Sequence, residues 1–87
     1  MSMEYEKITF TAVEFVDDPN VVGNQYWYVC EIDGATVGDK VIAPLGKHNN
    51  TQQGIIRKIL VDYEYNAPYP MYAIKYIKKL IKADTNV

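Results

Sequence analysis

The sequence has little of the residue types that build covalent or metal-held frameworks. Cys30 is the one cysteine among 87 residues, so no disulfide can form within the chain and a zinc site with several cysteine ligands is excluded. Such cysteine usage fits a reducing, intracellular compartment. No apolar run approaches the roughly 20 residues that a membrane helix needs, and the segment from Met1 to Glu6 lacks the basic start and apolar stretch of a signal peptide. We therefore expect a cytoplasmic protein with no membrane partner.

Residues suited to catalysis are also scarce. His48 is the only histidine and lies in a polar stretch, where a solvated side chain is expected rather than a general base. Cys30 lies on the apolar face of an expected strand, so we predict that its thiol is buried and unreactive. The Asp17–Asp18 pair precedes a proline and indicates a turn. No paired carboxylates, His-rich cluster or glycine-rich phosphate loop occurs. The sequence therefore predicts a protein that is not an enzyme and that holds no metal or cofactor.

Aromatic residues, by contrast, are plentiful. The chain contains eight Tyr, two Phe and one Trp, and hydrophobic residues make up 48% of it, which is ordinary for a globular protein. Residues 1–87 suffice for a single small domain. Tyrosine can fill a core or leave a flat, half-polar face for recognition, and both interpretations stay open for each tyrosine.

Strand signals dominate the chain. Segments rich in β-branched and aromatic residues predict strands near residues 8–16, 26–33, 40–45 and 54–63. In the first, the apolar positions Ile8, Phe10 and Ala12 are followed by Val13 and Phe15. This shift of one position in an alternating pattern predicts a bulge near Ala12–Val13.

The second strand and the C-terminal segment complete the predicted fold. The face of residues 26–33 that carries Trp27 ends in Glu31 and Asp33, so we expect it to face water. Residues 47–53 predict a polar loop, and residues 71–82 fit either a helix or a last strand. We therefore expect a mainly β fold: a small antiparallel barrel, SH3-like or related, with a short helical turn or strand at the C-terminus.

Charge is divided between the two halves of the chain. Residues 1–39 hold eight acidic and one basic side chain, whereas residues 40–87 hold three acidic and eight basic ones. Such asymmetry can create a dipolar surface that orients an anionic partner. The alternative is that the two halves interleave in the fold and their charges pair.

The segment from Tyr26 to Ile59 resembles a known family. The ordered motifs are an aromatic strand opener, Val37-Gly38-Asp39-x-Val41, Pro44-x-Gly46-Lys47 and Gly54-Ile55-Ile56. They are similar to the N-terminal 3′-end-binding domain of the primosomal replication-restart helicase, primosomal protein N′. Ile74-Lys75-Tyr76-Ile77 also matches an element that follows in that family.

The resemblance implies a small β-barrel whose pocket takes the terminal base and 3′-hydroxyl of a DNA strand. By position, the pocket's aromatic residue falls on Tyr26, its glycine on Gly46 and its lysine on Lys75. The family's acid falls on Trp27, which departs from the pattern because an indole can only donate a hydrogen bond. The resemblance thus implies the fold more firmly than the ligand.

Two binding functions follow from these patterns. The first is binding of single-stranded DNA or RNA ends, with Lys47, Lys78 and Lys79 adding positive charge beside the implied pocket. The second is a protein–protein adaptor or a self-associating homodimer, because surface Tyr and Trp are favoured interface anchors. A purely structural interpretation also stays open for the motif glycines. In it Gly38, Gly46, Gly54 and the adjoining Asp39 are turn residues with no ligand role.

Overall fold

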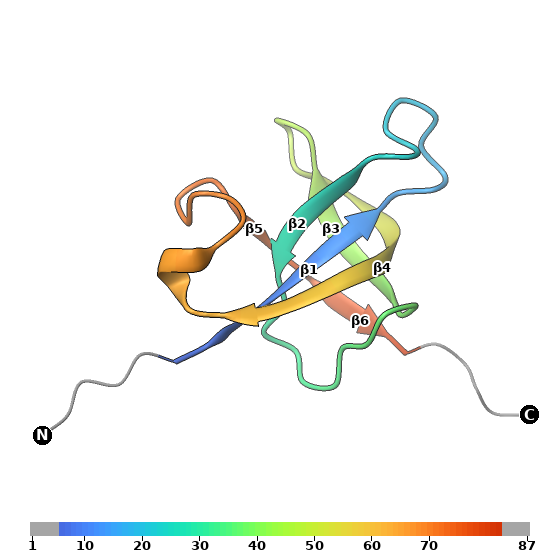
Figure 1. Ribbon diagram of the computed structural model, residues 1–87. Helices are drawn as coiled ribbons and strands as arrows, with labels where there is room; N and C mark the ends of the chain where they lie inside the picture. Colours follow the sequence, from blue (N-terminus) through green and yellow to red (C-terminus); the bar gives the residue numbers. More distant parts are fainter. Residues whose placement is uncertain (1–5, 83–87) are drawn as a thin grey trace, which may run out of the picture.

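Six strands form one curled sheet in the computed structural model, which describes residues 6–82 (Figure 1). They are β1 (Ile8–Glu14), β2 (Gln25–Val29), β3 (Lys40–Leu45), β4 (Asn50–Asp62), β5 (Lys75–Tyr76) and β6 (Lys79–Ile81). Within the described residues, the 3-10 turn η1 (Glu64–Asn66) is the one helical element. The fold is therefore mainly β, as predicted. Residues 1–5, which belong to the N-terminal segment considered above, lie outside the described part.

The strand order is β5-β2-β1-β4-β3-β6, and the sheet forms a strongly curled half-barrel (Figure 1). Every pair is antiparallel except β2 and β5, which run parallel. The prediction of a wholly antiparallel sheet is thus wrong at one edge. Parallel neighbours require a long crossover. Here the chain passes through β3, β4 and η1 before it returns alongside β2.

The sheet is irregular where the sequence predicts a bulge. Between Ala12 and Val13 the register with β4 shifts, because Ala12 pairs with Lys58 and Val13 pairs with Ile56. The residue left between the two pairs is Arg57, so the extra residue lies on β4 and not on β1. The shift in the apolar pattern of β1 has another cause: Phe10 and Val13 belong to two different hydrophobic clusters.

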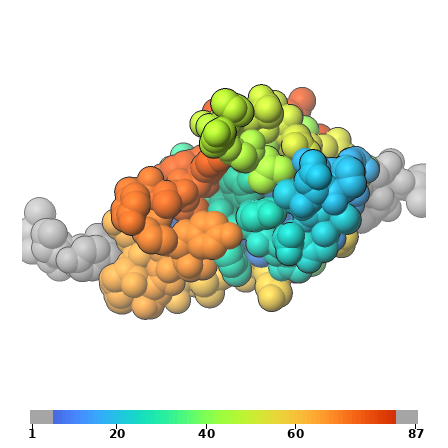
Figure 2. Space-filling view, turned by 90° about the horizontal axis from the view of Figure 1, so that it is seen from above, coloured from blue at the N-terminus to red at the C-terminus, as the bar shows by residue number. Residues whose placement is uncertain are grey.

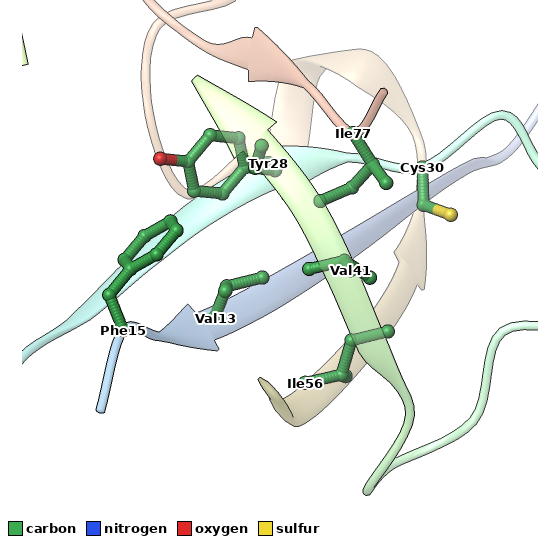
Figure 3. Packing of buried hydrophobic residues seen from close by; sticks show 8 residues of the cluster. Val13, Phe15, Tyr28, Cys30, Val41, Ile56 and Ile77 are labelled. Atoms are coloured by element: carbon green, nitrogen blue, oxygen red, sulfur yellow. The ribbon is translucent and has the colours of Figure 1, made fainter. Parts of the chain in front are cut away.

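The first cluster fills the inside of the curl. Its buried side chains come from neighbouring strands and from residues next to the strand ends (Figure 3). They are Val13, Phe15, Tyr28, Cys30, Val41, Ala43, Ile56 and Ile77. The prediction that Cys30 is buried is confirmed, since the residue is 4% exposed.

The second cluster lies where the segment after η1 folds back on the sheet. Phe10, Val29 and Ile74 are buried there, and Trp27 and Tyr69 pack against them. The prediction that the Trp27 face of the second strand faces water is therefore wrong. Val29 is fully buried and Trp27 half-buried, because residues 67–74 cover this face of β2.

Several predicted boundaries also change. The second strand ends at Val29 instead of residue 33, and β4 begins at Asn50, inside the predicted polar loop. Backbone pairing with β3 defines this part of β4, from Leu45 opposite Asn50 to Val41 opposite Gly54, so it needs no apolar side chains. Of the two alternatives for residues 71–82, the structure has strands, β5 and β6, and no helix.

Candidate nucleic-acid interface

Three segments that are distant in the sequence meet around a pocket of about 260 Å³. Figure 2 looks onto the face where β2 (teal), the turn after β3 (yellow-green) and the segment after η1 (orange) come together. The side chains and backbone that line the pocket come from Val21, Tyr26, Trp27, Tyr28, Leu45, Gly46, Tyr69, Ala73 and Lys75. We call it the aromatic pocket.

The aromatic pocket contains the four residues that the family resemblance implies. Tyr26 and Trp27 lie on β2, Gly46 in the turn after β3, and Lys75 on β5. Parallel pairing places Lys75 opposite Tyr28, which brings its ammonium to the pocket. The Lys75 Nζ donates a hydrogen bond of 2.6 Å to the Gly46 carbonyl.

A left-handed backbone holds the Gly46 carbonyl in place. Gly46 has a φ of 79° and Asn49 a φ of 55°, a region that glycine and asparagine tolerate better than other residues. The same Gly46 carbonyl also accepts the Asn49 amide at 3.1 Å. The sharp turn therefore orients the one charged group among the residues lining the pocket.

The floor of the pocket is neutral. The Tyr28 hydroxyl donates a hydrogen bond of 2.6 Å to the Pro44 carbonyl. Burial, together with the nearby Tyr69 and Tyr26, raises the pKa of Tyr28 above its ordinary value, so the phenol stays protonated at neutral pH. Among the described residues, no carboxylate lines the pocket. Flat apolar faces and one ammonium suit a planar aromatic group that carries a nearby negative charge.

A second hollow of about 380 Å³ adjoins the aromatic pocket and shares Lys75 with it. Its lining residues are Pro44, Asn49, Thr51, Lys75, Tyr76 and Lys78. We call it the basic hollow. Lys78 precedes β6, and its backbone amide donates to the Ile42 carbonyl at 2.8 Å, which fixes this stretch of the chain beside β3.

The other two predicted lysines line neither cavity. Lys47 is exposed in the turn after β3, and Lys79 is exposed on β6. Neither residue lines the aromatic pocket or the basic hollow.

Sequence reasoning missed several pocket residues. For Tyr69, as for every tyrosine, the sequence leaves a core role and a recognition role open. The signal that marks it is its place between Pro68 and Pro70, because two prolines restrict the backbone on either side of it. Asn49 and Thr51 were assigned to a featureless polar loop. Their role becomes visible only once β4 is known to begin at Asn50.

Within residues 6–82, no group of three or more His, Cys, Asp or Glu side chains is placed to hold a metal ion. No helix in this part of the chain is long and apolar enough to cross a membrane. The chain matches no family model, no curated protein and no solved structure.

Proposed function

We propose that this chain is a non-enzymatic binding module that takes the terminal base of a single-stranded DNA or RNA into the aromatic pocket. Its half-barrel would then be of the SH3-like or primosomal 3′-end-binding type. The observation that carries the proposal is the meeting of Tyr26, Trp27, Gly46 and Lys75 around one cavity. These residues are those to which the resemblance assigns the pocket of that family.

The chemistry of the pocket supports base stacking in particular. Aromatic side chains that stack on a base contribute about 1–3 kcal/mol and tolerate any base, since every base has a π-face. A volume of about 260 Å³ lies slightly below the range of about 300–1,000 Å³ typical of ligand sites. Such a pocket suits one base at the end of a strand better than a run of bases.

Trp27 replaces the carboxylate of the family pattern and weakens the expected grip on the terminal hydroxyl. An indole has an N–H donor and no acceptor, so the hydroxyl can only accept from it. Affinity therefore depends on stacking and on Lys75, and we expect weak, salt-sensitive binding. The 3′ polarity of the proposal rests on the family resemblance.

Trp27 also supplies the test, because it is the only tryptophan and it lines the pocket. Titration with a short oligonucleotide in low salt is expected to change the Trp27 emission, and a bulky group on the 3′ end is expected to weaken binding more than the same group on the 5′ end. The Tyr26→Leu variant is expected to bind at least about fivefold more weakly, given the stacking contribution.

Tyr72→Leu is the matched control, since Tyr72 is 93% exposed and lies outside the aromatic pocket. Its affinity for the strand should equal that of the wild type. Equal weakening by 3′ and 5′ blocking groups would rule out a specific 3′-end pocket and leave general strand binding. If no oligonucleotide binds in low salt, nucleic-acid binding is wrong.

A second candidate function is binding of a protein partner or of another copy of the chain. Exposed aromatic side chains near η1 favour it: Tyr65 is 73% exposed and Tyr72 is 93% exposed. They line a shallow hollow together with Glu64, Pro70 and Met71. A concentration-dependent dimer in sedimentation, combined with no strand binding, would favour this function over the first.

A further inference from the structure

The basic hollow has the composition of an anion site. Lys75 and Lys78 line it together with the neutral polar residues Asn49, Thr51 and Tyr76. Lysine, threonine, asparagine and tyrosine are all common donors to phosphate oxygens in nucleic-acid complexes. Among the described residues, no carboxylate lines the hollow.

The two lysines keep their charge available to a ligand. In residues 6–82 the ion pairs are Arg57 with Glu14 and Lys82 with Asp39, so neither Lys75 nor Lys78 belongs to one. Lys75 instead bonds to the neutral Gly46 carbonyl. An incoming anion therefore does not have to displace a carboxylate from either lysine.

The two cavities differ in character and meet at Lys75. The aromatic pocket offers flat apolar faces, and the basic hollow offers donors and positive charge. A nucleotide has the same division, with an apolar planar base on one side and an anionic backbone on the other. When the base is in the aromatic pocket, the linkage to the next nucleotide can leave the pocket past Lys75, the residue that lines both cavities.

We propose that the basic hollow is a phosphate subsite, which binds the phosphodiester joining the terminal nucleoside to its neighbour. This inference rests on the proposed function and goes beyond it: it gives the direction in which the strand leaves the pocket. It also assigns Lys78 to a phosphate contact and leaves Lys79, its neighbour in sequence, outside the site.

The test compares the loss of affinity when the charged linkage of the strand is made neutral with the loss when Lys78 is replaced. Two oligonucleotides are compared, identical except that the linkage before the terminal nucleoside is a phosphodiester in one and a neutral methylphosphonate in the other. With wild-type protein, the neutral linkage is expected to weaken binding by up to about fivefold, the upper end of the range for an exposed ion pair. The Lys78→Gln variant is expected to bind the phosphodiester strand that much more weakly and to bind both strands equally.

Lys79→Gln is the control, because it removes the same charge from the adjacent, exposed residue. It should retain the wild-type preference for the phosphodiester strand. Thermal unfolding of both variants checks that the fold is intact. Deoxyribose and ribose versions of the strands distinguish DNA from RNA as the source of the phosphate. For each strand that binds, Lys78→Gln is expected to remove the preference for the phosphodiester.

Three results would overturn the subsite. Equal losses in Lys78→Gln and Lys79→Gln would indicate general charge attraction, and a Lys78→Gln variant that still prefers the phosphodiester would place the phosphate elsewhere. In both cases the proposed function stands, because the strand still binds in the aromatic pocket. If neither strand changes the Trp27 emission of the wild type, the subsite and the proposed function both fail.

Discussion

Gly54 shows how one missing side chain permits the curvature of the sheet. It lies inside β4, opposite Val41 and next to the register shift of β1 and β4. A Cβ atom at this position would lie 2.4 Å from Val13 Cγ1, 3.1 Å from the Glu14 carbonyl oxygen and 3.2 Å from Phe15 Cδ1. The backbone of Glu14 and the side chains of the first cluster can therefore pack directly against β4 only because Gly54 has no side chain.

We predict that Gly54→Ala destabilises the fold by about 1–3 kcal/mol, the usual cost of overpacking a core. The main cause is the contact with Val13, so Val13→Ala in the same chain should relieve part of it. Chemical denaturation of the two single variants and the double variant measures the coupling. A double variant that loses the full sum of the two single costs would show that Val13 is not the obstacle.

Single motif residues divide into those that shape turns and those that do not. Gly38 and Gly46 have φ values of 99° and 79°, as the turn interpretation predicts. Asp39 also shapes its turn, since its carboxylate accepts hydrogen bonds from the amide and hydroxyl of Thr36. Gly54 is no turn residue, so sequence reasoning identified the right residue and the wrong reason. Only the register of three strands reveals the close approach.

At the scale of elements, Lys82, the residue that follows β6, connects the end of that strand to the loop before β3. The Lys82 Nζ lies 2.6 Å from Asp39 Oδ2 and also bonds to the Gly34 carbonyl and the Thr36 hydroxyl. Asp39 is fully buried, whereas the Lys82 side chain is about half-exposed. β6 has only three residues, so the contacts of Lys82 add to the few backbone hydrogen bonds that hold this strand against β3.

We predict that Lys82→Met lowers the free energy of unfolding by about 1–2 kcal/mol. This is less than the 3–5 kcal/mol typical of a fully buried pair, because solvent screens the lysine. In the Lys82→Met protein, the backbone amides of β6 should exchange with deuterium faster than those of β1. Lys79→Met, which removes the same charge from an exposed residue of β6, should change the free energy of unfolding by no more than about 0.5 kcal/mol and should leave the exchange of the β6 amides unchanged. Equal effects of the two substitutions would show that the contacts of Lys82 with the loop before β3 contribute nothing specific to stability.

The elements also show what periodicity can predict. The four longer strands appear where β-branched and aromatic residues cluster, and the register irregularity lies at Ala12–Val13. The prediction for the Trp27 face of β2 is wrong, because alternation of apolar and polar residues predicts one buried and one solvent-exposed face. Residues 67–74 cover the second side, and this contact between distant segments leaves no local pattern. β5 is missed for a similar reason: a two-residue strand is defined by its partner, β2.

At the scale of the whole molecule, the division of charge in the sequence is only partly neutralised by folding. Both ion pairs in the described residues join an acid of the first half to a base of the second, Glu14 to Arg57 and Asp39 to Lys82. The interpretation in which the halves interleave is therefore confirmed for these four residues.

The candidate site itself could be predicted only through the family resemblance, because Tyr26, Gly46 and Lys75 are brought together by three separate segments.

The remaining charges make the salt dependence of binding a test of the whole surface. Each phosphate neutralised on a single strand contributes a slope of about −0.7 to log affinity against log salt. If Lys75 and Lys78 together hold the one phosphodiester of the proposed subsite, the slope should be about −0.7. Lys78→Gln should bring the slope close to zero, because that variant is expected to lose the phosphate contact, and Lys79→Gln should leave the slope unchanged. The net charge of −2 gives no general attraction to a polyanion that would steepen it. A slope beyond about −3 would require a broad basic groove and contradict a local site. A slope near zero would exclude phosphate contacts and leave stacking alone.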